Sequence, residues 1–133
     1  MNKPTAILVT CVLFALASPA SAEPAYSDTY KTCLDASGGA TFAMIDCINA
    51  EEKFWDQRLN RSYQALLKQL TPDRQKSLRA AQRLWLQYRD ANCGFYFDPD
   101  GGQMARLTAT ECHLRMTADR ATELMCPPIL DPS

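Results

Sequence analysis

The segment Ala81–Cys93 reads AQRLWLQYRDANC and carries the clearest periodic pattern in the chain. Apolar and aromatic side chains recur every three to four residues, which is the period of an α-helix, in the stripe Leu78, Ala81, Trp85, Tyr88 and Asn92. Thr71-Pro72 marks the start of this helix, because threonine can cap a helix and proline suits its first position. The sequence therefore predicts a helix over residues 72–96.

Three further helices are predicted around this one. Residues 27–37 form a short helix that Gly38-Gly39 ends. Thr41 can cap a long helix over residues 42–70, which no glycine or proline interrupts and whose apolar stripe is Ile45, Ile48, Trp55, Leu59, Tyr63, Leu66 and Leu70. The turn-rich "DPDGG" at 98–102 precedes a last helix, with the stripe Met104, Leu107, Leu114, Ala121 and Met125, which Pro127-Pro128 ends. We expect an all-α fold, a small disulfide-bridged bundle of three to four helices with a long antiparallel helical hairpin.

The N-terminus has the features of a secretory signal peptide over residues 1–22. Lys3 precedes the apolar run Ala6–Ala17, and Ala20-Ser21-Ala22 is a typical cleavage site. Cleavage leaves a single domain of 111 residues, 23–133, with 13 basic and 15 acidic residues and thus a net charge of −2 (13 − 15). We expect a periplasmic or secreted protein without a membrane anchor, and its charge disfavours nucleic acid as a partner.

Five cysteines remain after cleavage: Cys33, Cys47, Cys93, Cys112 and Cys126. In an exported chain without a C-x-x-C motif, disulfides are favoured over metal ligands and redox catalysis. Because five is odd, at least one cysteine is free or paired with another molecule. The sequence alone leaves the pairing open.

A polar cluster is expected on the inner face of the hairpin. Helical geometry turns Arg89 toward the core and Asp90 toward water. In a tight hairpin Arg89 is level with position 53, within one turn of Glu52 and Asp56. We therefore predict that Arg89 pairs with one of these carboxylates, because an unpaired buried charge is costly. The pair can fix helix register or provide an acid and a base; the first is favoured, since catalysis needs a cleft.

Other chemistries have little support in the sequence. His113 is the only histidine and lies off the apolar stripe, which disfavours histidine metal sites. "DPDGG" lacks the spaced ligands of a calcium loop. No metal, cofactor or catalytic residue is expected.

Several motifs together resemble one known family. They are TFAMIDC, E...WD..LN..Y..L over 51–66 and LRAAQRLWLQYRDANC, followed by GG, Cys112 and T..R...L over 117–124. Between residues 33 and 124 the chain is similar to the N-terminal domain family of the lysozyme inhibitor LprI. The resemblance implies two local disulfides, Cys33–Cys47 and Cys93–Cys112, and leaves Cys126 outside the match. A Cys47–Cys93 bridge is the alternative, because these residues are nearly level in a tight hairpin.

The resemblance also implies a function, the inhibition of a lysozyme-type cell-wall hydrolase. Lysozymes are commonly cationic and hold two carboxylates in a cleft. The acidic loop between the last two helices is the candidate contact, with Phe97, Asp98, Asp100 and Gln103, unless it is an ordinary turn. The alternative is a periplasmic immunity or adaptor protein for another envelope enzyme or toxin. An enzyme acting through Arg89 and its carboxylates is the least favoured reading.

Overall fold

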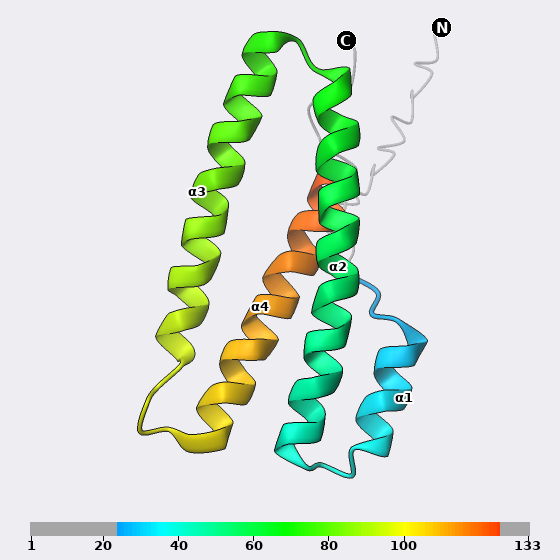
Figure 1. Cartoon of the computed structure of the whole chain (residues 1–133), viewed down its shortest axis with the longest axis vertical. Coiled ribbons are helices and arrows are strands. Elements are labelled where there is room, and N and C mark those ends of the chain that lie inside the picture. The colour runs from blue at the N-terminus through cyan, green and yellow to red at the C-terminus, as the bar shows by residue number, and fades with distance from the viewer. Residues whose placement is uncertain (1–23, 126–133) are drawn as a thin grey trace, which may run out of the picture.

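The computed structural model describes residues 24–125 as four α-helices joined by short turns (Figure 1). They are α1 (Asp28–Ala36), α2 (Thr41–Gln69), α3 (Pro72–Tyr96) and α4 (Gly102–Met125). The predicted signal peptide, Cys126 and Pro127-Pro128 lie outside the described residues. Among residues 24–125 there is no strand, which confirms the predicted all-α class.

The helices begin and end within a residue or so of the predicted positions. Ser27 caps α1, where its hydroxyl accepts a hydrogen bond from the Tyr30 amide, and Gly38 and Gly39 follow with φ of +57° and +80°. Such φ values suit glycine, which has no Cβ to clash. Pro72 opens α3 after Thr71, as predicted. The N-cap of α2 is Ala40, not Thr41, and no side chain caps this end.

The hydrophobic core lies mainly between α2 and α4. Its buried members are Ile48, Trp55, Leu59 and Leu66 from α2 and Leu107, Leu114, Ala118, Ala121 and Leu124 from α4. Helix α1 packs on α2, and α3 packs on α4. Figure 1 shows α4 rising between the two long helices, so that α4 is the central element.

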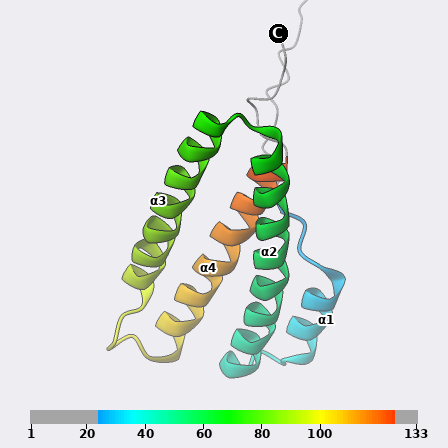
Figure 2. The same ribbon diagram turned by 45° about the horizontal axis from the view of Figure 1, so that its top comes forward.

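The tight packing expected between the two helices of the hairpin is wrong. Helices α2 and α3 are antiparallel and joined at Leu70-Thr71, but they diverge from this turn, and α4 packs against both of them farther down (Figure 2). The physical reason is that α4 offers α2 more apolar surface than α3 does; the only buried residues of α3 are Gln82 and Cys93. The apolar stripe of α2 is covered instead by the leucines and alanines of α4.

The face that α3 turns inward also differs from the prediction. Ala81 and Tyr88 were expected in the core stripe, yet both are exposed, and Tyr88 is 60% exposed. Trp85 is half-buried against the core, as expected. Helix α3 instead turns Gln82 and Arg89 inward. The hydrogen bonds and the disulfide that this face forms with α4 outweigh what burying Tyr88 would contribute.

Two disulfides close the short loops of the bundle. Cys33 is bonded to Cys47 and joins α1 to α2, while Cys93 is bonded to Cys112 and joins α3 to α4. Both pairings implied by the family resemblance are confirmed, and the alternative Cys47–Cys93 bridge is wrong. No helix of residues 24–125 is at once long enough and apolar enough to span a bilayer.

Candidate functional site

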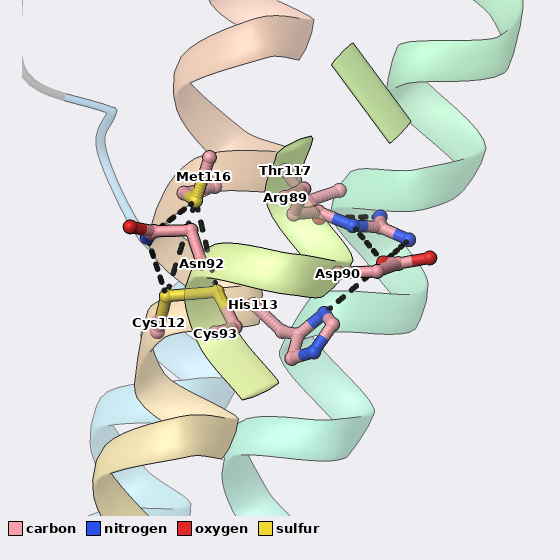
Figure 3. A network of polar contacts seen from close by, with 8 residues as sticks. All are labelled: Arg89, Asp90, Asn92, Cys93, Cys112, His113, Met116 and Thr117. Carbon is pink, nitrogen blue, oxygen red and sulfur yellow. Dashed lines mark hydrogen bonds and ion pairs between the residues drawn. A yellow bond between two sulfur atoms is a disulfide. The ribbon is translucent and has the colours of Figure 1, made fainter. Parts of the chain in front are cut away.

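Arg89 lies at the centre of a polar network between α3 and α4 (Figure 3). Its Nε and Nη2 atoms each donate to Oδ1 of Asp90 at 3.0 Å, and Nη1 donates to the Thr117 hydroxyl at 3.2 Å. The Arg89 side chain is 14% exposed, whereas that of Asp90 is 59% exposed. His113 extends the network, with Nδ1 4.0 Å from Asp90 Oδ1. Arg89 is thus oriented inward as predicted, but its carboxylate partner comes from its own helix.

The predicted cluster of Glu52, Asp56 and Arg89 does not form. Asp56 is exposed and accepts a hydrogen bond from Asn60 at 3.1 Å on its own helix. Glu52 is half-buried in a pocket described below, and it does not pair with Arg89. The cause is the divergence of α2 and α3, which separates the carboxylates from the guanidinium. The catalytic reading, which needs them together, has no support in this geometry.

Trp85 is the apolar partner of this network. The guanidinium carbons of Arg89 and Arg120 lie 5.2 and 5.9 Å from its ring centroid, at cation–π distances. Arg120 also donates through Nε to Gln82 at 3.1 Å and through Nη1 to Glu123 at 2.7 Å. These motif residues join α3 to α4, which is a structural role.

A buried carboxylate that the sequence analysis missed connects the N-terminal segment to α2. Glu51 is 4% exposed, and it accepts hydrogen bonds from the Ser27 amide at 2.9 Å, the Ser27 hydroxyl at 2.6 Å and Trp55 Nε1 at 3.0 Å. Its position one turn before Trp55 was the available signal, because a buried indole N–H needs an acceptor. Glu51 therefore acts as a structural anchor.

Two tyrosines pack beside this anchor. Tyr26 and Tyr30 lie edge to face at 5.4 Å, and Tyr26 meets Trp55 at 6.5 Å. Burial raises the pKa of Tyr26, and the charges of Asp119 and Glu51 add to this effect. Burial also raises the pKa of Tyr30, with contributions from Glu111 and Glu51. Both phenols thus keep their protons to higher pH than an exposed tyrosine.

The loop between α3 and α4 is exposed but conformationally fixed. Asp98 Oδ1 accepts from the Asp100 amide at 2.9 Å, and the Asp98 carbonyl accepts from the Gly101 amide at 3.0 Å. A Cβ on Gly101 would lie 2.7 Å from Ala105 Cβ, and Gly102 has φ +62°, so both positions require glycine. Asp98, Asp100 and Gln103 are all exposed. These hydrogen bonds and glycines hold the loop in one conformation. The Cys93–Cys112 disulfide also joins the two helices that flank it.

A pocket of about 280 Å³ lies beside this loop, between the start of α2 and the first turns of α4. Its lining combines aromatic, aliphatic and polar side chains: Phe42, Ile45, Asn49, Glu52, Phe97, Arg106, Ala109, Thr110 and His113. Phe42 and Phe97 are 60% and 44% exposed. Arg106 lies 5.6 Å from the centre of the Phe97 ring and supports it from one side. We call this pocket and the loop 97–103 together the loop face.

The structure places all four predicted contact residues, Phe97, Asp98, Asp100 and Gln103, in this one segment. Phe42 and Arg106 belong to the same face but were missed, because they come from other helices. Phe42, an aromatic residue outside the stripe of its helix, was the one sequence signal. Among residues 24–125, no group of three or more His, Cys, Asp or Glu side chains is arranged to hold a metal ion.

Comparison with known proteins bears on the identity of the chain. No curated protein and no solved structure shows significant similarity to it. The family model described as lysozyme inhibitor LprI matches residues 33–124, a stretch that includes both disulfides, the Arg89 network and the acidic loop. The match covers more than half of the chain, and the chain therefore belongs to the lysozyme inhibitor LprI family.

Proposed function

We propose that this protein is exported from the cytoplasm and inhibits a lysozyme-type cell-wall hydrolase by binding it through the loop face. Family membership is the observation that carries the proposal. The two disulfides are compatible with an extracytoplasmic location, where such bonds persist. The proposed mature chain begins at Glu23, after removal of residues 1–22.

The rigidity of the loop supports its role as the contact. A protein that enters an enzyme cleft binds more tightly when its segment needs no ordering, because less conformational entropy is lost. The loop 97–103 meets this condition through the hydrogen bonds at Asp98 and the adjacent disulfide. It also joins the ends of two helices at one end of the molecule, where a large partner can approach (Figure 1).

The chemistry of the loop face suits a cationic enzyme. Asp98 and Asp100 are exposed, so their charges can attract a positively charged surface over about one Debye length, roughly 8–10 Å. Phe42 and Phe97 supply exposed aromatic surface next to these charges, and aromatic side chains often dominate binding energy. The expected complex has an aromatic centre and an acidic rim.

A cell-wall lysis assay tests the proposal. The oxidised protein is titrated against a panel of lysozymes, and we expect dose-dependent protection that is lost after reduction and alkylation. Asp98→Asn with Asp100→Asn should raise the inhibition constant by roughly tenfold, since each exposed ion pair contributes up to about 1 kcal/mol. The matched control is Asp28→Asn with Asp35→Asn, which removes two exposed charges from α1 and should change nothing.

Two results would count against the proposal. Equal effects of the loop and α1 variants would show that net charge, not the loop, controls inhibition. Protection against no lysozyme would favour the alternative of an immunity or adaptor protein, and capture of partners from the native cell envelope would then identify the target. N-terminal sequencing of the protein purified from the periplasm tests the export step, with Glu23 as the expected first residue.

A further inference from the structure

We propose that the protein forms a symmetric homodimer through the outer face of α3, with the two copies of this helix antiparallel. The contact is a stripe of five exposed residues, Ala81, Leu84, Tyr88, Ala91 and Phe95, which we call the outer stripe. The outer stripe shares no residue with the loop face, although the charge pairing described below also uses Asp98 and Asp100 of the loop. The inference does not depend on the proposed function.

The outer stripe is an apolar surface that no other helix of the described part of the chain covers. Leu84, Tyr88 and Phe95 are 66%, 60% and 81% exposed. Helix α3 reaches α4 through its other side, where Arg89 binds Thr117 and Cys93 binds Cys112. Figures 1 and 2 both show α3 at one edge of the molecule, with no other described element outside it. A second helix can therefore approach the stripe freely.

The spacing of the stripe is that of a two-helix seam. Residues 81, 88 and 95 are separated by seven positions, and so are residues 84 and 91, with three or four positions between neighbours. This is the a/d pattern by which helices pair in coiled coils. In an antiparallel pair Leu84 lies beside Tyr88 of the second copy and Ala81 beside Ala91 of the second copy, so the stripe is complementary to itself.

The charges along α3 and the loop that follows it favour a second copy in the antiparallel orientation. Residues 72–83 carry Asp73 and four basic residues, Arg74, Lys76, Arg79 and Arg83, for a net charge of +3 (4 − 1). Residues 84–101 carry Arg89 and three acidic residues, Asp90, Asp98 and Asp100, for a net charge of −2 (1 − 3). Antiparallel pairing brings the basic start of each α3 near the acidic loop that follows the other copy's α3, whereas parallel pairing brings the two basic segments together.

One ion pair of this arrangement can be named. Arg74 lies seven residues before Ala81 and so continues the outer stripe toward the start of α3. In the same antiparallel register it lies near Asp98 of the second copy, and both residues are exposed. The twofold symmetry gives this pair twice, once at each end of the interface.

The area available is enough for a weak dimer. With roughly 200 Å² for a fully exposed large side chain, Leu84, Tyr88 and Phe95 present about 400 Å² per copy. Together, two stripes and their flanking residues could bury a total of roughly 1,200 Å² of accessible surface, which is the lower limit for specific protein–protein interfaces. We therefore expect association in the micromolar range rather than a permanent dimer.

Sedimentation equilibrium on the purified, oxidised protein tests the proposal. Twice the monomer mass should appear as the concentration rises. Leu84→Glu with Tyr88→Glu should weaken association by at least about 100-fold, because the charges would be buried in the seam. Phe42→Glu is the matched control, since Phe42 is as exposed as Tyr88 but lies on α2, and it should have no effect.

A charge reversal tests the orientation. Arg74→Glu should weaken association by about tenfold, since it makes both end pairs repulsive, and adding Asp98→Arg to the same chain should restore it. Cys126→Ser should leave the dimer intact, which separates it from an intermolecular disulfide. A monomer at every concentration, a dimer that survives the double stripe variant, or a dimer lost with Cys126 would each overturn the proposal. Failure of Asp98→Arg to restore association would overturn the antiparallel arrangement.

Discussion

Replacing Glu51 by alanine is expected to destabilise the protein far more than the same change at its neighbour Glu52. Glu51 is 4% exposed and accepts three hydrogen bonds, two from Ser27 and one from Trp55. Glu52 is half-buried and accepts none of the side-chain hydrogen bonds found among residues 24–125. The two residues are adjacent on α2, so the comparison sets a buried, hydrogen-bonded carboxylate against a half-buried one that accepts no side-chain hydrogen bond.

The magnitude follows from the partners that are left unsatisfied. A hydrogen bond to a charged group contributes about 1.5–3 kcal/mol, and an unpaired buried donor costs about 1–3 kcal/mol. The Trp55 indole N–H is buried, while the Ser27 groups are part-buried and can regain water. We therefore expect Glu51→Ala to lower the free energy of unfolding by about 3 kcal/mol, or roughly 15 °C in Tm for a domain of this size. Glu52→Ala should cost about 0.5 kcal/mol or less.

Urea unfolding of the oxidised protein provides the measurement, with circular dichroism for the helices and tryptophan fluorescence for Trp55, which is 3% exposed. Glu51→Gln should fall between wild type and Glu51→Ala, because the amide keeps one acceptor oxygen but presents an NH₂ group to a donor. Ser27→Ala combined with Glu51→Ala should be less than additive, since both remove the same bonds. A cost for Glu51→Ala within about 0.5 kcal/mol of that for Glu52→Ala would refute the reasoning.

Three further predictions concern other parts of the bundle. Arg89→Met should cost about 2 kcal/mol in urea unfolding, because the fully buried Thr117 hydroxyl loses its donor. Above pH 10.0, the ordinary pKa of tyrosine, the unfolded chain loses phenolic protons that the folded protein retains at Tyr26 and Tyr30. The contribution of these two groups to the free energy of unfolding is therefore constant below pH 10.0 and falls above it. Replacing both tyrosines by phenylalanine should make this fall with pH less steep. Replacing both cysteines of the Cys93–Cys112 bridge by serine should cost about 3 kcal/mol in thermal unfolding, and an unchanged Tm would contradict it.

The helices could be predicted from the sequence because their signals are local. Glycine, proline and capping serine act through the backbone of the residues beside them, so the turn at Gly38-Gly39 and the start of α3 at Pro72 needed no tertiary information. The pairing of the four cysteines did not follow from such local signals; it was implied by the family resemblance. The acidic loop was also visible, because its residues are contiguous.

Helix packing could not be predicted by the same reasoning. A hairpin with a short turn suggests that its two helices pack together, and this led to Arg89 being paired with Asp56 or Glu52. The choice between α3 and α4 as the partner of α2 depends on which helix offers more apolar surface to bury, and α4 offers Leu107, Leu114 and four buried alanines. That comparison involves the whole bundle rather than any one segment.

The sequence by itself thus determined the helical class, the approximate helix boundaries and, through its motifs, the family; the two disulfides followed only from what that family implies. Only the tertiary structure decided that α4 is central, that Glu51 rather than Glu52 is the buried carboxylate, and that Phe42 joins Phe97 beside the acidic loop. The reason is physical: backbone propensities and turns act within a few residues, whereas burial depends on surfaces that meet across the fold.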